Sequence, residues 1–315
     1  MKENFVNNVT VRGYIFSHSL QQRVTGPNAK QPNTPFIMGD LNVAVDEDGM
    51  NVIPVHFTYV TEFRKNGNSN STYTDLLSII NGVDTYEKVG VDAVKVRING
   101  DLEINDFYNR NGELVSAKRV RGGFLHFITP NETLNPCATF ETDMLAMSSI
   151  DHEVENGEDY LELKGYVFNF RKDALPVSFS VTSEAGRNFF ESMDFSPSEP
   201  YFGKVWGNII NTTVVSSREV ESEDVGFGQP VVTQTTRSFR TWQVDGANVG
   251  LELDDDTITL GDIKRLVQER ETRLADLKAQ TEARLNGNNQ SAFPEAKTSK
   301  KGAGKSPTEN KDYVF

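Results

Sequence analysis

The chain has 315 residues and a formal net charge of −13, with 37% hydrophobic and 24% charged residues. This length and apolar content are typical of about two packed domains. No apolar run approaches the 18 residues that predict a membrane-spanning helix, and the N-terminus lacks the apolar segment of a secretory signal. The single cysteine, Cys137, excludes an internal disulfide. We therefore expect a cytoplasmic protein that does not span a membrane.

The first 130 residues predict three strands, a short helix and two further strands. Alternating apolar residues and Gly-containing hairpin turns indicate the strands. Apolar residues at helical spacing from Tyr73 to Ile80 indicate the helix. The predicted elements are strands at Phe5–Phe16, Phe36–Asp46 and Val52–Val60, a long loop at Gln21–Pro35, a helix at Thr72–Asn81, and strands at Val94–Leu102 and Leu114–Phe127.

Residues 131–250 repeat this order and carry most of the acidic excess, with 19 acidic and 8 basic side chains. A weak internal repeat relates 11–16 to 163–168, because both hexapeptides contain a basic residue, Gly, Tyr, an aliphatic residue and Phe in that order. The predicted elements are strands at Ala138–Met147, Tyr160–Phe170 and Ala174–Val181, a short helix from Ala185 to Met193, and strands at Tyr201–Val215 and Val231–Val244.

The C-terminal part predicts one helix and a polar tail. Residues 259–285 have apolar residues at heptad spacing, and Thr259 with Asp262 resembles a capping box. Arg270 and Arg284 interrupt the apolar seam, so we do not expect a stable coiled coil. Residues 286–315 are rich in Asn, Gly, Ser, Lys and Pro, which predicts a disordered tail.

Catalytic and metal-binding patterns are weak. The four histidines are scattered and have no cysteine partner at ligand spacing, which disfavours a zinc site. Gly302-Ala303-Gly304-Lys305-Ser306 lacks the first glycine, the strand and the helix of a phosphate-binding loop. The acidic run at 254–256 is interpreted as a solvated turn before a helix rather than a cation site. We therefore predict no enzyme activity, no cofactor and no metal.

The strongest signal is the interleaving of basic and aromatic residues on predicted strands. Side chains alternate between the two faces of a strand, so one cation and two rings share a face in each copy of the repeat. Single-stranded nucleic acid uses such a surface, because bases stack on rings and phosphates contact cations. The candidate binding residues are Arg12, Tyr14, Phe16, Phe63, Arg64, Lys65, Lys95, Arg97, Lys118, Arg119, Arg121, Phe124, Lys164, Tyr166, Phe168, Arg237, Phe239, Arg240 and Trp242. The alternative is that these rings pack in a core or in a protein–protein interface.

Three strands, a helix and two strands is the order of the five-stranded Greek-key OB barrel. Such a barrel, followed by a polar tail with an acid near a terminal Phe, resembles the single-stranded DNA-binding proteins of bacteria and their phages. The resemblance implies binding and protection of single-stranded DNA in replication, recombination or repair, in the host cytoplasm if the chain is phage-encoded. It also implies recruitment of partner proteins through Asp312, Tyr313 and Phe315, and a possible homo-oligomer.

The expected organisation is mainly β, with two OB-like barrels in tandem, a C-terminal helix and a disordered tail. The expected boundaries are 1–130 and 131–250 for the barrels, 251–285 for the helix and 286–315 for the tail. The alternative function is a structural or assembly protein of a virion, built from β domains without nucleic-acid binding.

Overall fold

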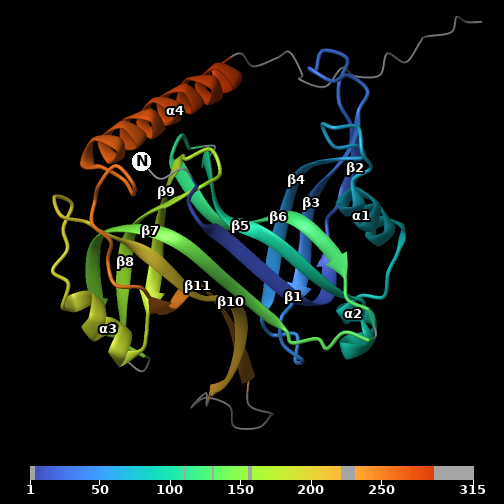
Figure 1. Cartoon of the computed structure of the whole chain (residues 1–315). Coiled ribbons are helices and arrows are strands. Elements are labelled where there is room, and N and C mark those ends of the chain that lie inside the picture. The colour runs from blue at the N-terminus through green and yellow to red at the C-terminus, as the bar shows by residue number, and fades with distance from the viewer. Residues whose placement is uncertain (1–3, 110, 130, 155–157, 221–230, 287–315) are drawn as a thin grey trace, which may run out of the picture.

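The computed structural model describes residues 4–109, 111–129, 131–154, 158–220 and 231–286 (Figure 1). For residues 213–220, 231–238, 285 and 286 it describes the backbone alone. The strands are β1 (Asn7–His18), β2 (Gln21–Val24), β3 (Pro35–Ala44), β4 (Val52–Thr61), β5 (Lys95–Tyr108), β6 (Leu114–Phe127), β7 (Cys137–His152), β8 (Tyr160–Phe168), β9 (Ala174–Val181), β10 (Tyr201–Val220) and β11 (Val231–Ala247). The helices are α1 (Ser71–Asn81), α2 (Tyr86–Val89), α3 (Glu184–Glu191) and α4 (Leu260–Asn286), with a 3-10 turn at Gly90–Asp92.

The strands close into two rings of five. Ring 1 runs β1-β3-β4-β6-β5 and closes because β1 pairs with both β3 and β5. Ring 2 runs β7-β8-β9-β11-β10 and closes through β10 and β7. In each ring the third strand pairs parallel with the fifth, and the other pairs are antiparallel. With a helix between the third and fourth strands, both rings have the OB topology, so the predicted fold of two OB-like barrels followed by a helix is confirmed.

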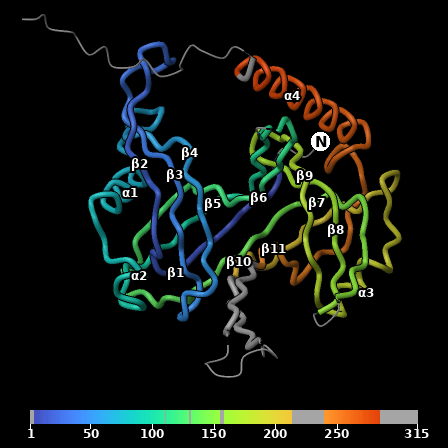
Figure 2. Tube along the Cα trace, turned by 180° about the vertical axis from the view of Figure 1, so that it is seen from behind, coloured from blue at the N-terminus to red at the C-terminus, as the bar shows by residue number. Residues whose placement is uncertain are grey.

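The first strands of the two rings pair with each other. β1 and β7 are antiparallel neighbours, with Val9 opposite Phe140. A second contact comes from the β3–β4 hairpin, where Asn51 accepts a hydrogen bond from the Asn211 backbone on β10 at 2.9 Å. Figure 2 shows the two groups of strands side by side, with the backbone of β1 and β7 between them.

Alternating apolar residues fill the interior of each ring. Val9, Val11 and Ile15 of β1 are buried, as their spacing predicts, and so are Leu163 and Val167 of β8. Burying each such side chain contributes about 1.5–3 kcal/mol relative to leaving it in water. The apolar face of each strand therefore fixes which of its residues point outward.

The internal repeat at 11–16 and 163–168 does not relate equivalent strands. Residues 11–16 lie in β1, the first strand of ring 1, whereas 163–168 lie in β8, the second strand of ring 2. The glycines that do correspond are Gly100 and Gly207, on the fourth strand of each ring, where an added Cβ would collide with the carbonyl oxygen of the fifth strand. The hexapeptide similarity therefore does not identify equivalent positions in the two rings. The close backbone contact at each of these glycines does.

The predicted loop at Gln21–Pro35 also contains a short edge strand, β2, which pairs antiparallel with β3. Its four residues are all exposed, so it has no apolar alternation to reveal it. Helix α2 and the 3-10 turn were not predicted either, because four and three residues are too short to show a helical period.

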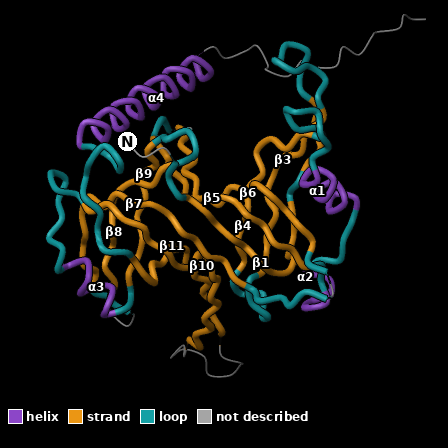
Figure 3. Tube along the Cα trace, viewed as in Figure 1, coloured by secondary structure: helices purple, strands orange, loops and turns teal. Residues whose placement is uncertain are grey.

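Helix α4 begins with the predicted capping box. The Asp262 backbone donates to Thr259 Oγ1 at 3.1 Å, and Thr259 Oγ1 donates to the Asp262 carboxylate at 2.9 Å. Ile263 and Leu266 are buried against Phe168 and Phe202 of ring 2. Figure 3 shows the helix as a long element lying above the end of β9. Of the helices in the described part of the chain, none combines the length and apolar content that a bilayer-spanning helix needs.

Candidate nucleic-acid interface

A cleft of about 1750 Å³ opens between ring 1 and α4. Its floor is the outer face of the β5–β6 hairpin, from 99–106 and 119–124. One wall comes from the loop at 31–35 and from the end of β4 with the turn that follows it, at 58–67. The other wall comes from the β8–β9 turn at 169–173 and from α4 at 273–280. Both rings and the C-terminal helix therefore contribute to one site.

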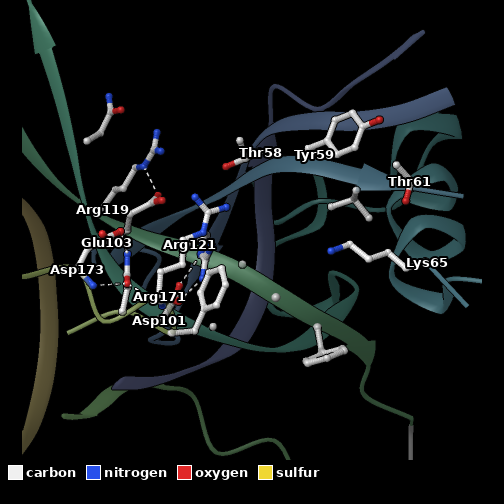
Figure 4. Close-up of a pocket in the computed structure, with 18 of the residues that line it drawn as sticks. Thr58, Tyr59, Thr61, Lys65, Asp101, Glu103, Arg119, Arg121, Arg171 and Asp173 are labelled. Carbon is white, nitrogen blue, oxygen red and sulfur yellow. Dashed lines mark hydrogen bonds and ion pairs between the residues drawn. The ribbon is translucent and has the colours of Figure 1, made fainter. Parts of the chain in front are cut away.

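Cross-strand ion pairs fix the floor. The β5–β6 register places Asp101 opposite Arg121 and Glu103 opposite Arg119. Arg119 Nε lies 2.6 Å from Glu103 Oε2, and Arg121 Nε lies 2.8 Å from Asp101 Oδ1, with a second contact through Nη2. The hydrogen bond to Asp101 raises the pKa of Arg121. Figure 4 shows both arginines beside their carboxylates, across the cleft from Tyr59 and Lys65.

The two walls carry the same tripeptide, Phe-Arg-Lys. Phe63-Arg64-Lys65 follows β4, and Phe170-Arg171-Lys172 forms the turn between β8 and β9. Of these six residues, all but Lys172 line the cleft, and the five that do are exposed. The two walls therefore present similar chemistry from different rings.

Local hydrogen bonds build the second turn. Asn169 Oδ1 accepts from the backbone N–H groups of Arg171 and Asp173, each at 2.9 Å, as is typical of an Asx turn. Lys172 takes a φ of 65°, which completes the reversal. The turn presents the Phe170 ring to the cleft, with the guanidinium carbons of Arg121 and Arg171 at 5.3 Å and 5.2 Å from the ring centroid. Such cation–π contacts orient the ring.

Exposed aromatic rings are concentrated in this cleft. Among the described residues, seven aromatic side chains are exposed, and the cleft contains four of them, Tyr59, Phe63, Phe124 and Phe170. Phe170 has the largest exposed fraction of these rings, 69%. Exposed apolar groups that gather in one concave surface mark a binding site.

The charge of the cleft is balanced overall, but three of its cations have no carboxylate partner among the described residues. Six basic and six acidic residues line it. Arg119, Arg121 and Arg273 have carboxylate partners. For Arg64, Lys65 and Arg171, the described residues supply no carboxylate within ion-pair distance. These three cations lie on the walls, whereas both arginines of the floor are paired with floor carboxylates.

Comparison with known proteins gives a family. A family model described as YorF matches residues 6–280. The chain belongs to the YorF family. Among solved structures, it is similar to a deletion variant of the single-stranded DNA binding protein from Thermus aquaticus, with a TM-score of 0.46 and 14% identity over 79% of this chain and 97% of that chain. No curated protein matches the chain.

In this YorF family member, six of the residues singled out from sequence line the cleft, Phe63, Arg64, Lys65, Arg119, Arg121 and Phe124. The sequence reasoning missed Tyr59, Phe170 and Arg171, and it did not place α4 beside them. The second Phe-Arg-Lys tripeptide was the available signal for two of these, because the first copy had already been singled out.

The outward-facing rings of β1 are covered by another part of the chain, so the prediction that they form an open surface for stacking is wrong. Tyr14 is buried and Phe16 is half-buried, and both rings contact Tyr86 of α2 at centroid distances of 5.9 Å and 5.8 Å. Lys95 lies 5.6 Å over the Tyr14 ring, and Arg12 donates to the Thr133 carbonyl at 3.0 Å. The alternation of side chains correctly predicted that Tyr14 and Phe16 lie on the outer face of β1, but α2 covers this face.

The outward-facing rings of β8 are covered as well. Phe168 is buried and stacks on Phe5 at a centroid distance of 4.2 Å, and Tyr166 is half-buried beside the first turns of α4. Lys164 is exposed and forms an ion pair with Glu162 at 3.3 Å. The expectation of open rings is therefore wrong for this strand too.

The remaining predicted residues do not line the cleft. Trp242 is buried inside ring 2, whereas Phe239 and Arg240 are exposed elsewhere. Lys118 donates to Ser178 on β9 at 2.5 Å and 2.8 Å. Arg97 is exposed, and of Arg237 only the backbone is described. Asp312, Tyr313 and Phe315 lie outside the described residues.

The described residues hold no group of three or more His, Cys, Asp or Glu side chains gathered closely enough to bind a metal ion. The acidic run at 254–256 forms a turn in which the Asp254 carboxylate accepts from the backbone N–H groups of Asp256 and Thr257 at 3.0 Å and 2.9 Å. This carboxylate is therefore used in local structure.

Proposed function

We propose that the cleft binds single-stranded nucleic acid without sequence preference, and that its ligand in the cell is single-stranded DNA during replication or recombination. The observation that carries this proposal is the gathering, in one cleft of about 1750 Å³, of four exposed rings and three cations that have no carboxylate partner within the described part of the chain. Aromatic platforms beside cations are what unpaired strands bind, because every base has a stacking face and every nucleotide has a phosphate.

The division between walls and floor assigns a role to each part. Arg64, Lys65 and Arg171 on the walls contact phosphates, because no carboxylate competes for them among the described residues. Phe63, Phe124 and Phe170 stack on bases, each base contributing about 1–3 kcal/mol. The arginines of the floor are already paired with carboxylates and attract phosphates less than the wall cations do, so bases rather than the backbone face the β5–β6 hairpin.

This arrangement favours single strands over duplexes. In a duplex, the base faces are already stacked on one another and cannot reach the rings. Only the three wall cations would then contribute, through contacts that do not depend on stacking.

The test is a titration of fluorescently labelled oligo-dT and of a duplex of the same length, followed by anisotropy. We expect much tighter binding of the single strand. With three phosphate contacts, the logarithm of its association constant should fall with the logarithm of salt concentration at a slope of about −2. Absence of binding, or equal affinity for the duplex, would contradict the proposal.

A further inference from the structure

We infer that the single-strand site has two half-sites, one on each ring, and that α4 holds the second half-site in place through Arg270 and Arg273. The first half-site is the Phe63-Arg64-Lys65 segment, and the second is the Phe170-Arg171 turn. This inference rests on the proposed function and assigns a role to a helix that lies outside both barrels.

The first link joins α4 to β5. Arg270 is 8% exposed, and its guanidinium contacts the Asp106 carboxylate through both terminal nitrogens, Nη1 at 2.6 Å and Nη2 at 2.7 Å. Asp106 also accepts from Ser116 Oγ at 2.6 Å. The Nη2 contact is a hydrogen bond, and the Nη1 contact is an ion pair without hydrogen-bond geometry. The arginine that interrupts the apolar seam of α4 thus fixes this helix against the floor hairpin of ring 1.

The second link joins α4 to the β8–β9 turn, about one helical turn later. Arg273 Nη1 lies 3.0 Å from Asp173 Oδ1. Asp173 Oδ2 in turn accepts from Asn169 Nδ2 at 2.9 Å, and the amide oxygen of the same Asn169 accepts the backbone hydrogen bonds that form the turn. The contacts are therefore continuous from β5 through α4 to the backbone that carries Phe170.

The position of α4 beside the cleft supports the same role. Leu274, Leu277 and Gln280 line the cleft, and the two leucines are half-buried. The helix is anchored at its other end, where Ile263 and Leu266 are buried against ring 2. The helix therefore connects ring 2 to the β5–β6 hairpin. Its C-terminal part forms one wall of the cleft.

Two linked half-sites predict a specific dependence on strand length. A short oligonucleotide occupies one half-site, whereas a longer one occupies both, and the second contact is then intramolecular. If the β8–β9 turn loses its fixed position, the gain from length falls while binding of the short oligonucleotide is retained. A purely structural role of α4 would instead weaken binding at every length.

The experiment compares oligo-dT from about 4 to about 16 nucleotides in the full-length wild type and in Arg273→Ala. Arg273 is exposed, so this substitution should leave the fold intact. Lys278→Ala is the matched control, because it removes a charge from an exposed position of the same helix that does not line the cleft. A charge swap, Arg273→Asp with Asp173→Arg, tests whether the ion pair itself matters.

We expect the wild type and Lys278→Ala to gain affinity steeply with length, and Arg273→Ala to lose about tenfold or more of that gain. The charge swap should restore it. An undiminished gain in Arg273→Ala would overturn the inference, and so would failure of the swap, since the ion pair between positions 273 and 173 would then not be what preserves the gain. In both cases the wild type still binds and the proposed function stands. Absence of binding by the wild type at every length would overturn the proposed function itself and this inference with it.

Discussion

The proposed stacking of bases depends most on the ring of Phe170. Its ring is 69% exposed, and the guanidinium groups of Arg121 and Arg171 contact it. Arg121 is itself held by Asp101 across the β5–β6 pair. The ring is thus oriented before any ligand arrives, and a base that stacks on it loses little ordering free energy of the protein.

Substitution Phe170→Ala removes this stacking surface. We expect the affinity for oligo-dT to fall by about 1–3 kcal/mol, or about 5- to 150-fold. Phe239→Ala is the control, because Phe239 is 56% exposed and does not line the cleft. Anisotropy titrations of both variants provide the comparison, with circular dichroism to show that the folds are unchanged. Equal affinities for the two variants would contradict the assignment.

The connection between β11 and α4 depends on a buried hydroxyl group. Tyr201, at the start of β10, donates its hydroxyl proton to the Asn248 carbonyl at 2.7 Å and so holds the segment between β11 and α4. Burial raises the pKa of Tyr201 to about 12 from the ordinary value of 10.0. The native state therefore keeps this proton at pH values where the unfolded chain has lost it.

The sign of the resulting pH dependence follows from that difference. The contribution is complete below pH 10.0 and disappears as pH rises toward about 12, for a total of about 3 kcal/mol. Tyr201→Phe keeps the ring but cannot ionise. Urea unfolding at increasing alkaline pH should therefore show the wild type losing its advantage over Tyr201→Phe within this window. Parallel pH profiles for the two proteins would show that the Tyr201 hydroxyl is not buried as described.

At the scale of the whole molecule, the sequence predicted the OB topology and half of the site. Strand alternation and turn residues placed β9 at its observed bounds and placed α1 within one residue. The alternation of side chains along a strand also predicted which residues of β1 and β8 face outward. It could not tell what covers those faces, because α2 and α4 come from distant parts of the chain. The sequence carries one signal for the β8–β9 turn, the second Phe-Arg-Lys tripeptide, but only the folded chain places this turn on the same cleft as residues 63–65.

The central claim is that a strand lies in the cleft between ring 1, the β8–β9 turn and α4. Photochemical crosslinking of the full-length protein to a single strand that contains 5-iodouracil, followed by mass spectrometry of the crosslinked peptides, tests this claim directly. We predict crosslinks within residues 58–67, 119–124 and 169–173, at the rings of Tyr59, Phe63, Phe124 and Phe170. Crosslinks that gather instead at Phe239 or Trp206, with none in the cleft, would contradict it.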